Sequence, residues 1–365
     1  MKIFKQILPA LMLGALAVSC TSLKSEQRSG EIDFQVARYS TATKADPADY
    51  KDAYQSIPFG TYAWYKGLQE SDNTTYFANR PVGYEQERGR WTTIGTTYYW
   101  PLTGTLDFIS YSPYTADGTD APAPAIGEDY IRYSTPWNVD EHPEVDIMYA
   151  DKAIGLSGNA SNTFNHGYDG VPTLFRHALA RIEFRLRAGI CSRTAADGEI
   201  TSWEIDINSI TLENLLTTGT LSLSLAEDGT WEKPETNAWS ATAPAVSRPV
   251  AATALETLTE EAQSAGGAFF VLPQQLDAQR LTLDVTIRTY RDKQDGSGAK
   301  LIITEKNVPC HAALKTDVID TWGINQYITY ILTIYPIDPE ENDTILFDPA
   351  VADWERKFVE TEILL

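Results

Sequence analysis

The sequence has few of the residues that build catalytic and metal sites. Among 365 residues there are only 3 cysteines, 4 histidines and 3 methionines. The chain also lacks the HExxH, GxSxG, P-loop, GxGxxG and CxxC patterns, each of which places reactive groups at a fixed spacing. We therefore expect a protein that is not an enzyme and that carries no cofactor and no metal ion.

Positive charge is scarce as well. The 29 lysines and arginines are outnumbered by 50 acidic residues, which gives a formal net charge of −21. A chain this acidic is repelled by the phosphate backbone, so we expect no nucleic-acid partner. Two acidic clusters, at residues 140–146 and 338–343, lack the spacing of a calcium loop, and we interpret them as solvated loops.

Helical periodicity is rare, and alternation with period two dominates from residue 31 onward. It is clearest in the four stretches IDFQV (32–36), ALARIEFRLR (178–187), TLSLSL (220–225) and RLTLDVTIRTY (280–290). The last stretch is followed by a turn-rich DKQDGSG and by LIIT, which predicts a hairpin. In EIDINSITL the apolar parity switches between Ile207 and Ile210, which predicts a bulge. Faces of this kind predict an all-β protein of antiparallel sheets packed as sandwiches.

The length allows two domains of moderate size. The first half carries aromatic strands separated by long loops, and a change of composition near residues 167–173 precedes the regular strands of the second half. We expect a signal peptide at 1–19, an N-terminal domain at 20–172 and a C-terminal domain at 173–365.

The N-terminus indicates export. Lys2 and Lys5 precede an apolar run at 7–18 that is too short for a typical membrane span, and small residues lead into Cys20. This pattern is similar to a bacterial lipobox, which implies cleavage before Cys20 and lipidation of its thiol. The alternative is a plain secreted protein.

Two cysteines remain in the exported chain. Cys191 and Cys310 both flank predicted strands. An oxidising compartment permits a disulfide between them. Two separate, small buried thiols are the equal alternative.

Several stretches, taken in order, resemble the fimbrillin (Mfa-like) family of Bacteroidota surface pilins and accessory fimbrial proteins. These stretches are IDFQV (32–36), YAWY (62–65), YWP (99–101), LDFISYSP (106–113), VDIMYA (145–150), LFRHALARI (174–182), LPQQ (272–275), WGINQYITY (322–330) and ILFDPAVADW (345–354). The resemblance covers nearly all of the exported chain.

The resemblance implies two transthyretin-like β-sandwich domains and a palmitate-bearing lipoprotein at the outer membrane, cell surface or fimbrium. It also implies a fimbrial subunit that other pilin subunits join by donor-strand exchange after a protease removes the first strand, here residues 31–37. Arg38 follows that strand directly. Lys44 stands where family members often have an arginine, so either residue is a candidate processing site.

A donor strand is expected near the C-terminus. Val359, Thr361, Ile363 and Leu365 share one parity. The alternative is that they form the last strand of their own domain. An adhesive role toward host or bacterial surface ligands is expected as an addition to polymerisation. The alternative function is a monomeric surface lipoprotein that binds glycan or host protein through loops of the N-terminal domain.

Overall fold

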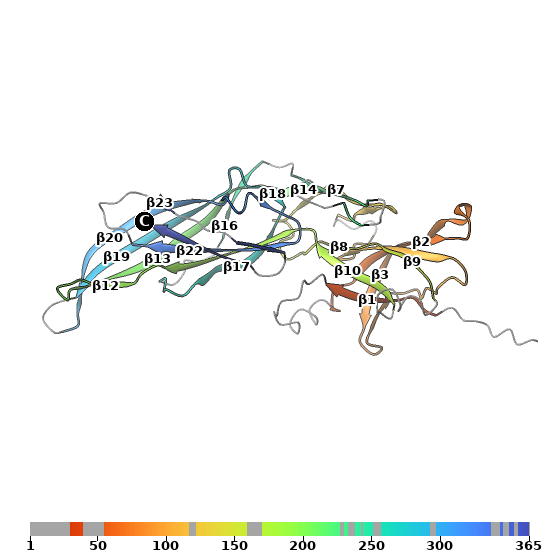
Figure 1. The fold of residues 1–365 in the computed structure, drawn as a ribbon, viewed down its shortest axis with the longest axis horizontal. Helices are drawn as coiled ribbons and strands as arrows, with labels where there is room; N and C mark the ends of the chain where they lie inside the picture. The colour runs from red at the N-terminus through yellow and green to blue at the C-terminus, as the bar shows by residue number, and fades with distance from the viewer. Residues whose placement is uncertain are drawn as a thin grey trace, which may run out of the picture.

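The computed structural model describes the chain in separate stretches. These are residues 30–38, 55–116, 122–158, 170–226, 230–232, 238–241, 244–250, 257–292, 297–336, 344–345, 350–353 and 357–364. Within them the chain forms strands and one short 3-10 helix, η1 (Glu70–Asp72). The strands fall into two groups at the two ends of an elongated molecule (Figure 1).

The first group is an eight-stranded sheet. Its members are β1 (Asp33–Arg38), β2 (Phe59–Lys66), β3 (Thr74–Glu85), β4 (Arg90–Thr93), β5 (Thr105–Ser112), β8 (Met148–Ala150), β9 (Ala153–Leu156) and β10 (Val171–His177). The order is β2-β3-β4-β1-β10-β8-β5-β9, and β2 also pairs with β5. The pairing of β2 with β5 closes seven of the strands into a barrel-like ring. The eighth strand, β9, also pairs with β5, next to the residues of β5 that pair with β8.

Apolar side chains of alternate parity fill this ring and also cover one side of it. Ala63, Leu106 and Phe108 point into the barrel core, whereas Trp64 and Ile109 belong to a second cluster outside it. A four-stranded sheet packs on that outer cluster. It consists of β6 (Ala125–Ile126), β7 (Tyr130–Asn138), β14 (Thr218–Ser224) and β15 (Trp239–Ala241).

The second group is made of two sheets that share one core. One sheet contains β11 (Ala180–Ala188), β17 (Gln263–Val271), β22 (Gln326–Tyr335), β23 (Thr344–Ile345), β24 (Ala350–Asp353) and β25 (Lys357–Leu364). The other contains β12 (Ser192–Thr194), β13 (Ile200–Leu215), β16 (Val246–Pro249), β19 (Arg280–Asp292) and β20 (Lys300–Ala313). A short pair, β18 (Gln274–Gln275) and β21 (Thr321–Trp322), stands apart from both.

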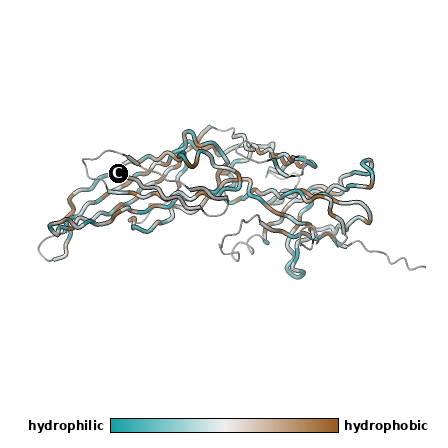
Figure 2. Tube along the Cα trace, in the orientation of Figure 1, coloured by the Kyte–Doolittle hydropathy of each residue, from teal (hydrophilic) through white to brown (hydrophobic). Residues whose placement is uncertain are grey.

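The strand predictions with the strongest alternation are confirmed. Polar and apolar residues alternate along the strands (Figure 2), and β11 alternates between buried and half-buried positions over its whole length. β19 and β20 form the predicted hairpin. The predicted bulge is present, because the pairing of β13 with β19 shifts register between Ile207 and Ser209.

The all-β class is confirmed, but the architecture differs from the prediction in the first half. Residues that were expected to form a two-sheet sandwich close into a barrel-like ring, because β2 pairs with β3 on one edge and β5 on the other. The sheets are also not purely antiparallel, since β1 with β10, β11 with β22, and β22 with β25 are parallel pairs.

The expected boundary between residues 172 and 173 falls inside β10, which still belongs to the barrel. β14 and β15 lie between two strands of the second group in the sequence, yet they pair with β7 beside the barrel. This crossing ties the two halves together. The passage from the barrel to the second group along the chain lies between the end of β10 at His177 and the start of β11 at Ala180.

Candidate functional site

The β1 segment (residues 31–38) has neighbours on both edges. It runs parallel to β10 from the Phe34–Val171 pair to the Arg38–Phe175 pair. Its other edge is antiparallel to β4, with Asp33 opposite Thr92 and Phe34 opposite Trp91. A strand in this position is an internal member of the ring. Its removal would therefore leave two strands with unpaired backbone groups.

The inner face of the segment enters the barrel core. Ile32 and Phe34 are 1% and 2% exposed, and Val36 packs against the same cluster. The ring of Phe34 lies edge-on to Phe59 and Phe108, with centroids 5.6 and 5.9 Å apart. Burying a side chain of this size contributes about 1.5–3 kcal/mol. The segment is therefore part of the core and not merely laid over it.

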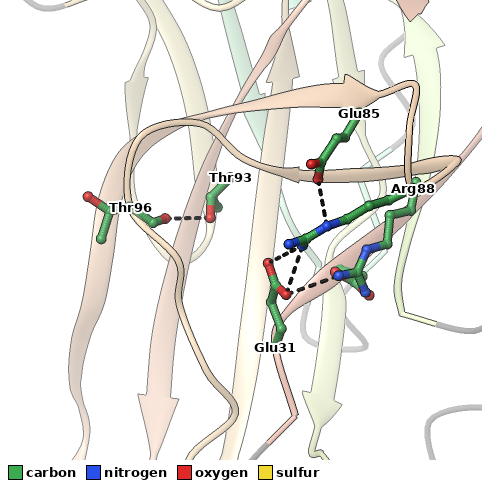
Figure 3. Close-up of polar contacts among 7 residues, drawn as sticks. Glu31, Glu85, Arg88, Thr93 and Thr96 are labelled. Carbon is green, nitrogen blue, oxygen red and sulfur yellow. Dashed lines mark hydrogen bonds and ion pairs between the residues drawn. The ribbon is translucent and has the colours of Figure 1, made fainter.

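The outer face of the segment carries two carboxylates that meet two arginines, Arg88 and Arg90, which we call the arginine clasp. Arg90 donates to Asp33 through Nη1 and to Glu31 Oε2 through Nη2, the latter at 3.0 Å. Arg88 Nη1 lies 3.2 Å from the same Glu31 oxygen, and its Nε lies 3.4 Å from Glu85. Figure 3 shows Arg88 held between Glu31 and Glu85.

The clasp offsets the cost of burying Asp33 only in part. Burial raises the pKa of the Asp33 carboxyl above its usual value, and this effect outweighs the lowering caused by Arg90. Asp33 Oδ1 and Arg90 Nε are both buried without a hydrogen-bond partner. The ladder and the apolar face therefore hold the segment in place more than its ion pairs do.

Backbone contacts fix the start of the segment. Ile32 N–H donates to Tyr98 O at 2.9 Å, and Trp100 N–H donates to Gly30 O at 3.0 Å. Gly170, at the start of β10, has φ +111°, and a Cβ there would lie 2.8 Å from Asp33 O. Only glycine fits this close approach between β10 and the segment.

One of the two predicted processing residues, Arg38, lies at the far end of the segment. Arg38 is the last residue of β1, with its backbone opposite Phe175. Lys44 and the predicted lipidation residue Cys20 lie outside the described residues. Within the described part of the chain, no helix is long and apolar enough to cross a membrane.

The predicted donor residues lie in β25, apart from Leu365, which lies outside the described residues. Val359, Thr361 and Ile363 pair with Tyr330, Leu332 and Ile334 of β22. In this structure β25 is thus a member of the sheet that also contains β11, β17 and β22 of the same chain. Among the described residues, the far edge of β25 pairs with the two residues of β23.

Cys191 and Cys310 are both free thiols. Cys191 O accepts from Trp203 N–H, and Trp203 is opposite Thr289, whereas Cys310 is opposite Leu283. Six residues of β19 thus separate the two sites, about 20 Å along the strand. A disulfide needs Cα atoms within about 7 Å. In this structure the two thiols are separate, with Cys310 buried and Cys191 partly buried.

The histidine and acidic residues form structural contacts. His177 is buried at the end of β10, and its Nδ1 lies 2.6 Å from Asp146 Oδ2. Asp140 pairs with Arg248 at 3.2 Å. Among the described residues no group of three or more His, Cys, Asp or Glu is arranged to hold a metal ion.

The arginine clasp was not anticipated from the sequence. Arg88 and Arg90 flank a glycine turn, and Glu31 and Asp33 stand two residues apart on a predicted strand. Arg90 is the first residue of β4, and Arg88 lies in the turn before it. The spacing of Glu31 and Asp33 places both carboxylates on one face of a strand, which is the signal that the sequence offers.

Residues 43–354 match the family described as Fimbrillin-like. Because this match spans well over half of the chain, the protein belongs to the fimbrillin-like family. The search among curated proteins gives no match.

Solved structures from Bacteroides species are similar in fold. A fimbrial protein from Bacteroides vulgatus has 15% identity and a TM-score of 0.53, with 89% of this chain and 99% of that chain covered. A candidate cell adhesion protein from Bacteroides uniformis has 14% identity and a TM-score of 0.45, covering 89% and 98%. One from Bacteroides ovatus has 14% identity and a TM-score of 0.43, covering 93% and 99%. The similarity to the Bacteroides vulgatus protein supports a common fold. The other two TM-scores are too low to support a conclusion about this chain.

Proposed function

We propose that this chain is a structural, non-enzymatic fimbrial subunit that polymerises by strand exchange. A protease cuts after Arg38 or Lys44, the β1 segment leaves, and a strand of another subunit takes its place. The export route is that of a lipoprotein, with lipid on Cys20 and assembly with other pilin subunits at the outer surface. An adhesive role at that surface is an addition to polymerisation.

The observation that carries this proposal is the position of β1. It is the first strand of the described chain, it is paired on both edges, and its Ile32 and Phe34 fill the barrel core. Its loss leaves an apolar slot bordered by the unpaired edges of β4 and β10. Adding a strand satisfies both edges and refills the slot, which is the physical basis of strand addition at a sheet.

The test is to cut the exported chain with an arginine- and lysine-specific protease and to run it without boiling on a denaturing gel. Mass spectrometry locates the cut. We expect a ladder of polymers after cutting at Arg38 or Lys44, and monomer from the matched double variant Arg38→Gln/Lys44→Gln. A correctly cut chain that stays monomeric, also when mixed with other pilin subunits, contradicts the proposal.

A second candidate function rests on exposed apolar loop residues. Leu68 and Leu102 are 83% and 76% exposed. Their loops are adjacent, since Tyr65 Oη and Thr103 Oγ1 lie 3.4 Å apart. Such a surface suits binding of a glycan or host protein by the uncut monomer. Binding on a glycan array that is lost in Leu68→Ser/Leu102→Ser would favour this function over polymerisation.

A further inference from the structure

A buried pair of opposite charges lies on the outer side of the barrel. Lys152 Nζ is 3.4 Å from Asp107 Oδ2, and the two side chains are only 11% and 7% exposed. Lys66 and Lys315 also pair with carboxylates, but their side chains are 27% and 50% exposed, and their partners are more exposed still. In the described part of the chain, the Lys152–Asp107 pair is therefore the lysine–carboxylate contact most fully withdrawn from water.

Two distant parts of the chain meet at this pair. Leu106 and Phe108 of β5 point into the barrel core, so alternation turns Asp107 outward, to the side of the cluster that contains Trp64. Trp64 of β2 stands opposite Asp107 in the ladder. Lys152 lies between β8 and β9, and both of these strands pair with β5. The fold thus brings the amine and the carboxyl together from neighbouring elements of one sheet.

The remaining polar contacts of the pair match those of an amide. Asp107 Oδ1 accepts a hydrogen bond from Gly155 N–H at 2.8 Å. Lys152 Nζ donates to Glu128 O at 2.9 Å. An amide has one carbonyl acceptor and one N–H donor, and here a partner for each is in place. The other carboxyl oxygen, Oδ2, is the one that faces the amine.

Burial gives this pair a reason to react. Taking an ammonium and a carboxylate out of water costs several kcal/mol per ion, and their attraction offsets this cost only in part. A neutral amide between Lys152 and Asp107 would remove both charges and keep both hydrogen bonds. In water, hydration favours the separate ions, but this site is closed to most of that hydration. Because the fold holds the two groups in contact, they need no bimolecular encounter.

We propose that Lys152 and Asp107 condense into an isopeptide bond, a covalent cross-link between β5 and the segment that joins β8 to β9. The new bond joins Lys152 Nζ to Asp107 Cγ, and the bond between Cγ and Oδ2 breaks. Two protons of the ammonium go to Oδ2, which leaves as water, and one hydrogen stays on the amide nitrogen. The step needs no oxidant, reductant or co-reactant. The cross-link does not depend on strand exchange.

The experiment is to fold and purify the full chain, denature it, digest it with trypsin and measure the peptides by mass spectrometry. Trypsin does not cut after a lysine whose amine is part of an amide. The linked chain therefore gives one branched product, in which peptide 91–132 is joined to peptide 133–176. Its mass is one water below the sum of the two peptides. The unlinked chain gives 91–132, 133–152 and 153–176 as separate peptides.

Matched variants test the role of the lysine. Lys152→Arg keeps a cation beside Asp107, but a guanidinium stays protonated and does not attack a carboxyl group. We expect this variant to lose the branched product completely. Lys315→Arg is the control, because Lys315 lies 3.2 Å from Asp277 in an exposed pair. We expect it to give as much branched product as the parent. If Lys152→Arg does not fold, the peptides of the parent chain still decide the question.

The outcomes are distinct from those of the strand-exchange test. A parent chain that gives only the separate peptides, each with the mass of its sequence, overturns the cross-link. A branched product that persists in Lys152→Arg overturns the assignment to Lys152. A second branched product that joins Lys315 to Asp277 overturns the requirement for burial. Polymer ladders are measured on a gel and stand or fall independently of these results.

Discussion

The first and the last strands of the described chain are held in different ways. β1 lies inside a closed ring between β4 and β10, and its neighbouring Ile32 and its Phe34 belong to the barrel core. β25 is paired along its length with β22, and within the described part of the chain its other edge pairs with two residues of β23. Loss of β1 opens a ring, whereas loss of β25 uncovers essentially one edge.

The neighbours of the two strands differ in the same sense. β22 keeps a parallel ladder of eight residue pairs with β11 when β25 is absent. Among the described strands, β10 would keep its three pairs with β8, at Phe175, Arg176 and His177. Loss of β1 therefore removes a larger share of the pairing of β10 than loss of β25 removes from β22. This difference is what a subunit requires if it accepts a strand at one end and donates one from the other.

The largest expected effect is at Phe34. Phe34→Ala removes a fully buried ring that packs against Phe59 and Phe108. We expect the free energy of unfolding of the uncut barrel to fall by about 3–5 kcal/mol, from lost burial and the cavity left behind. Denaturant unfolding measures this change in free energy, and hydrogen exchange at the amides of β4 and β10 measures the local effect on the barrel.

Gln35→Ala is the control for this change, because Gln35 lies on the outer parity of the same strand. We expect it to alter the free energy of unfolding by no more than about 0.5 kcal/mol. If Phe34→Ala has an effect as small as that of Gln35→Ala, β1 is not a core strand and the contrast with β25 disappears.

The second effect is that of removing residues 354–365. The lost ladder contributes about 0.5–1.5 kcal/mol per hydrogen bond, and a released backbone residue regains about 1–2 kcal/mol of conformational entropy. Because these terms nearly cancel, we expect a change in the free energy of unfolding below about 2 kcal/mol. Hydrogen exchange should speed up at the β22 amides that face β25 and stay unchanged in the barrel. Global unfolding of the truncated chain would show that β25 is as integral as β1.

The sequence predicted which residues face inward more reliably than which strands are neighbours. Ile32, Phe34 and Val36 alternate in the sequence and share the barrel core in the structure. Alternation reports the face of a strand because side chains change sides at every residue. It carries no information on whether the neighbour is parallel or antiparallel, so the β1–β10 and β11–β22 pairs were not foreseen.

Closure of the barrel and the arginine clasp depend on long-range contacts. The closing pair joins β2 to β5 through backbone groups, from Lys66 opposite Thr105 to Gly60 opposite Tyr111, which are 39 and 51 residues apart in sequence. Arg90 meets Asp33 across 57 residues. A charged residue in an acidic chain has many candidate partners, and only the fold selects among them. β1 was therefore predictable as a strand, whereas the arginines that pair with its carboxylates were not.

The smallest expected effect is the pH dependence of the β1 segment. Burial raises the pKa of the Asp33 carboxyl above its ordinary value of 3.8, against the lowering by Arg90 and Arg88 and together with the raising by Glu31. A carboxyl whose pKa is higher in the folded state binds protons more tightly there. Its stabilising contribution is therefore complete below the unfolded pKa and is lost as the pH rises through the folded pKa. The ionised form at neutral pH holds the segment less firmly.

Asp33→Asn isolates this contribution, because asparagine does not titrate. We expect the denaturation midpoint of the parent chain to fall relative to that of Asp33→Asn as the pH rises from about 4 toward neutral, and the difference to level off once Asp33 is ionised. Release of the β1 segment after cutting should be faster at neutral than at acid pH in the parent chain, with a smaller change in Asp33→Asn. A difference that grows in favour of the parent with rising pH would show that attraction to Arg90 exceeds the burial penalty. Ion pairing would then add to the apolar burial that holds the first strand, and charge would become part of the contrast with the C-terminal strand.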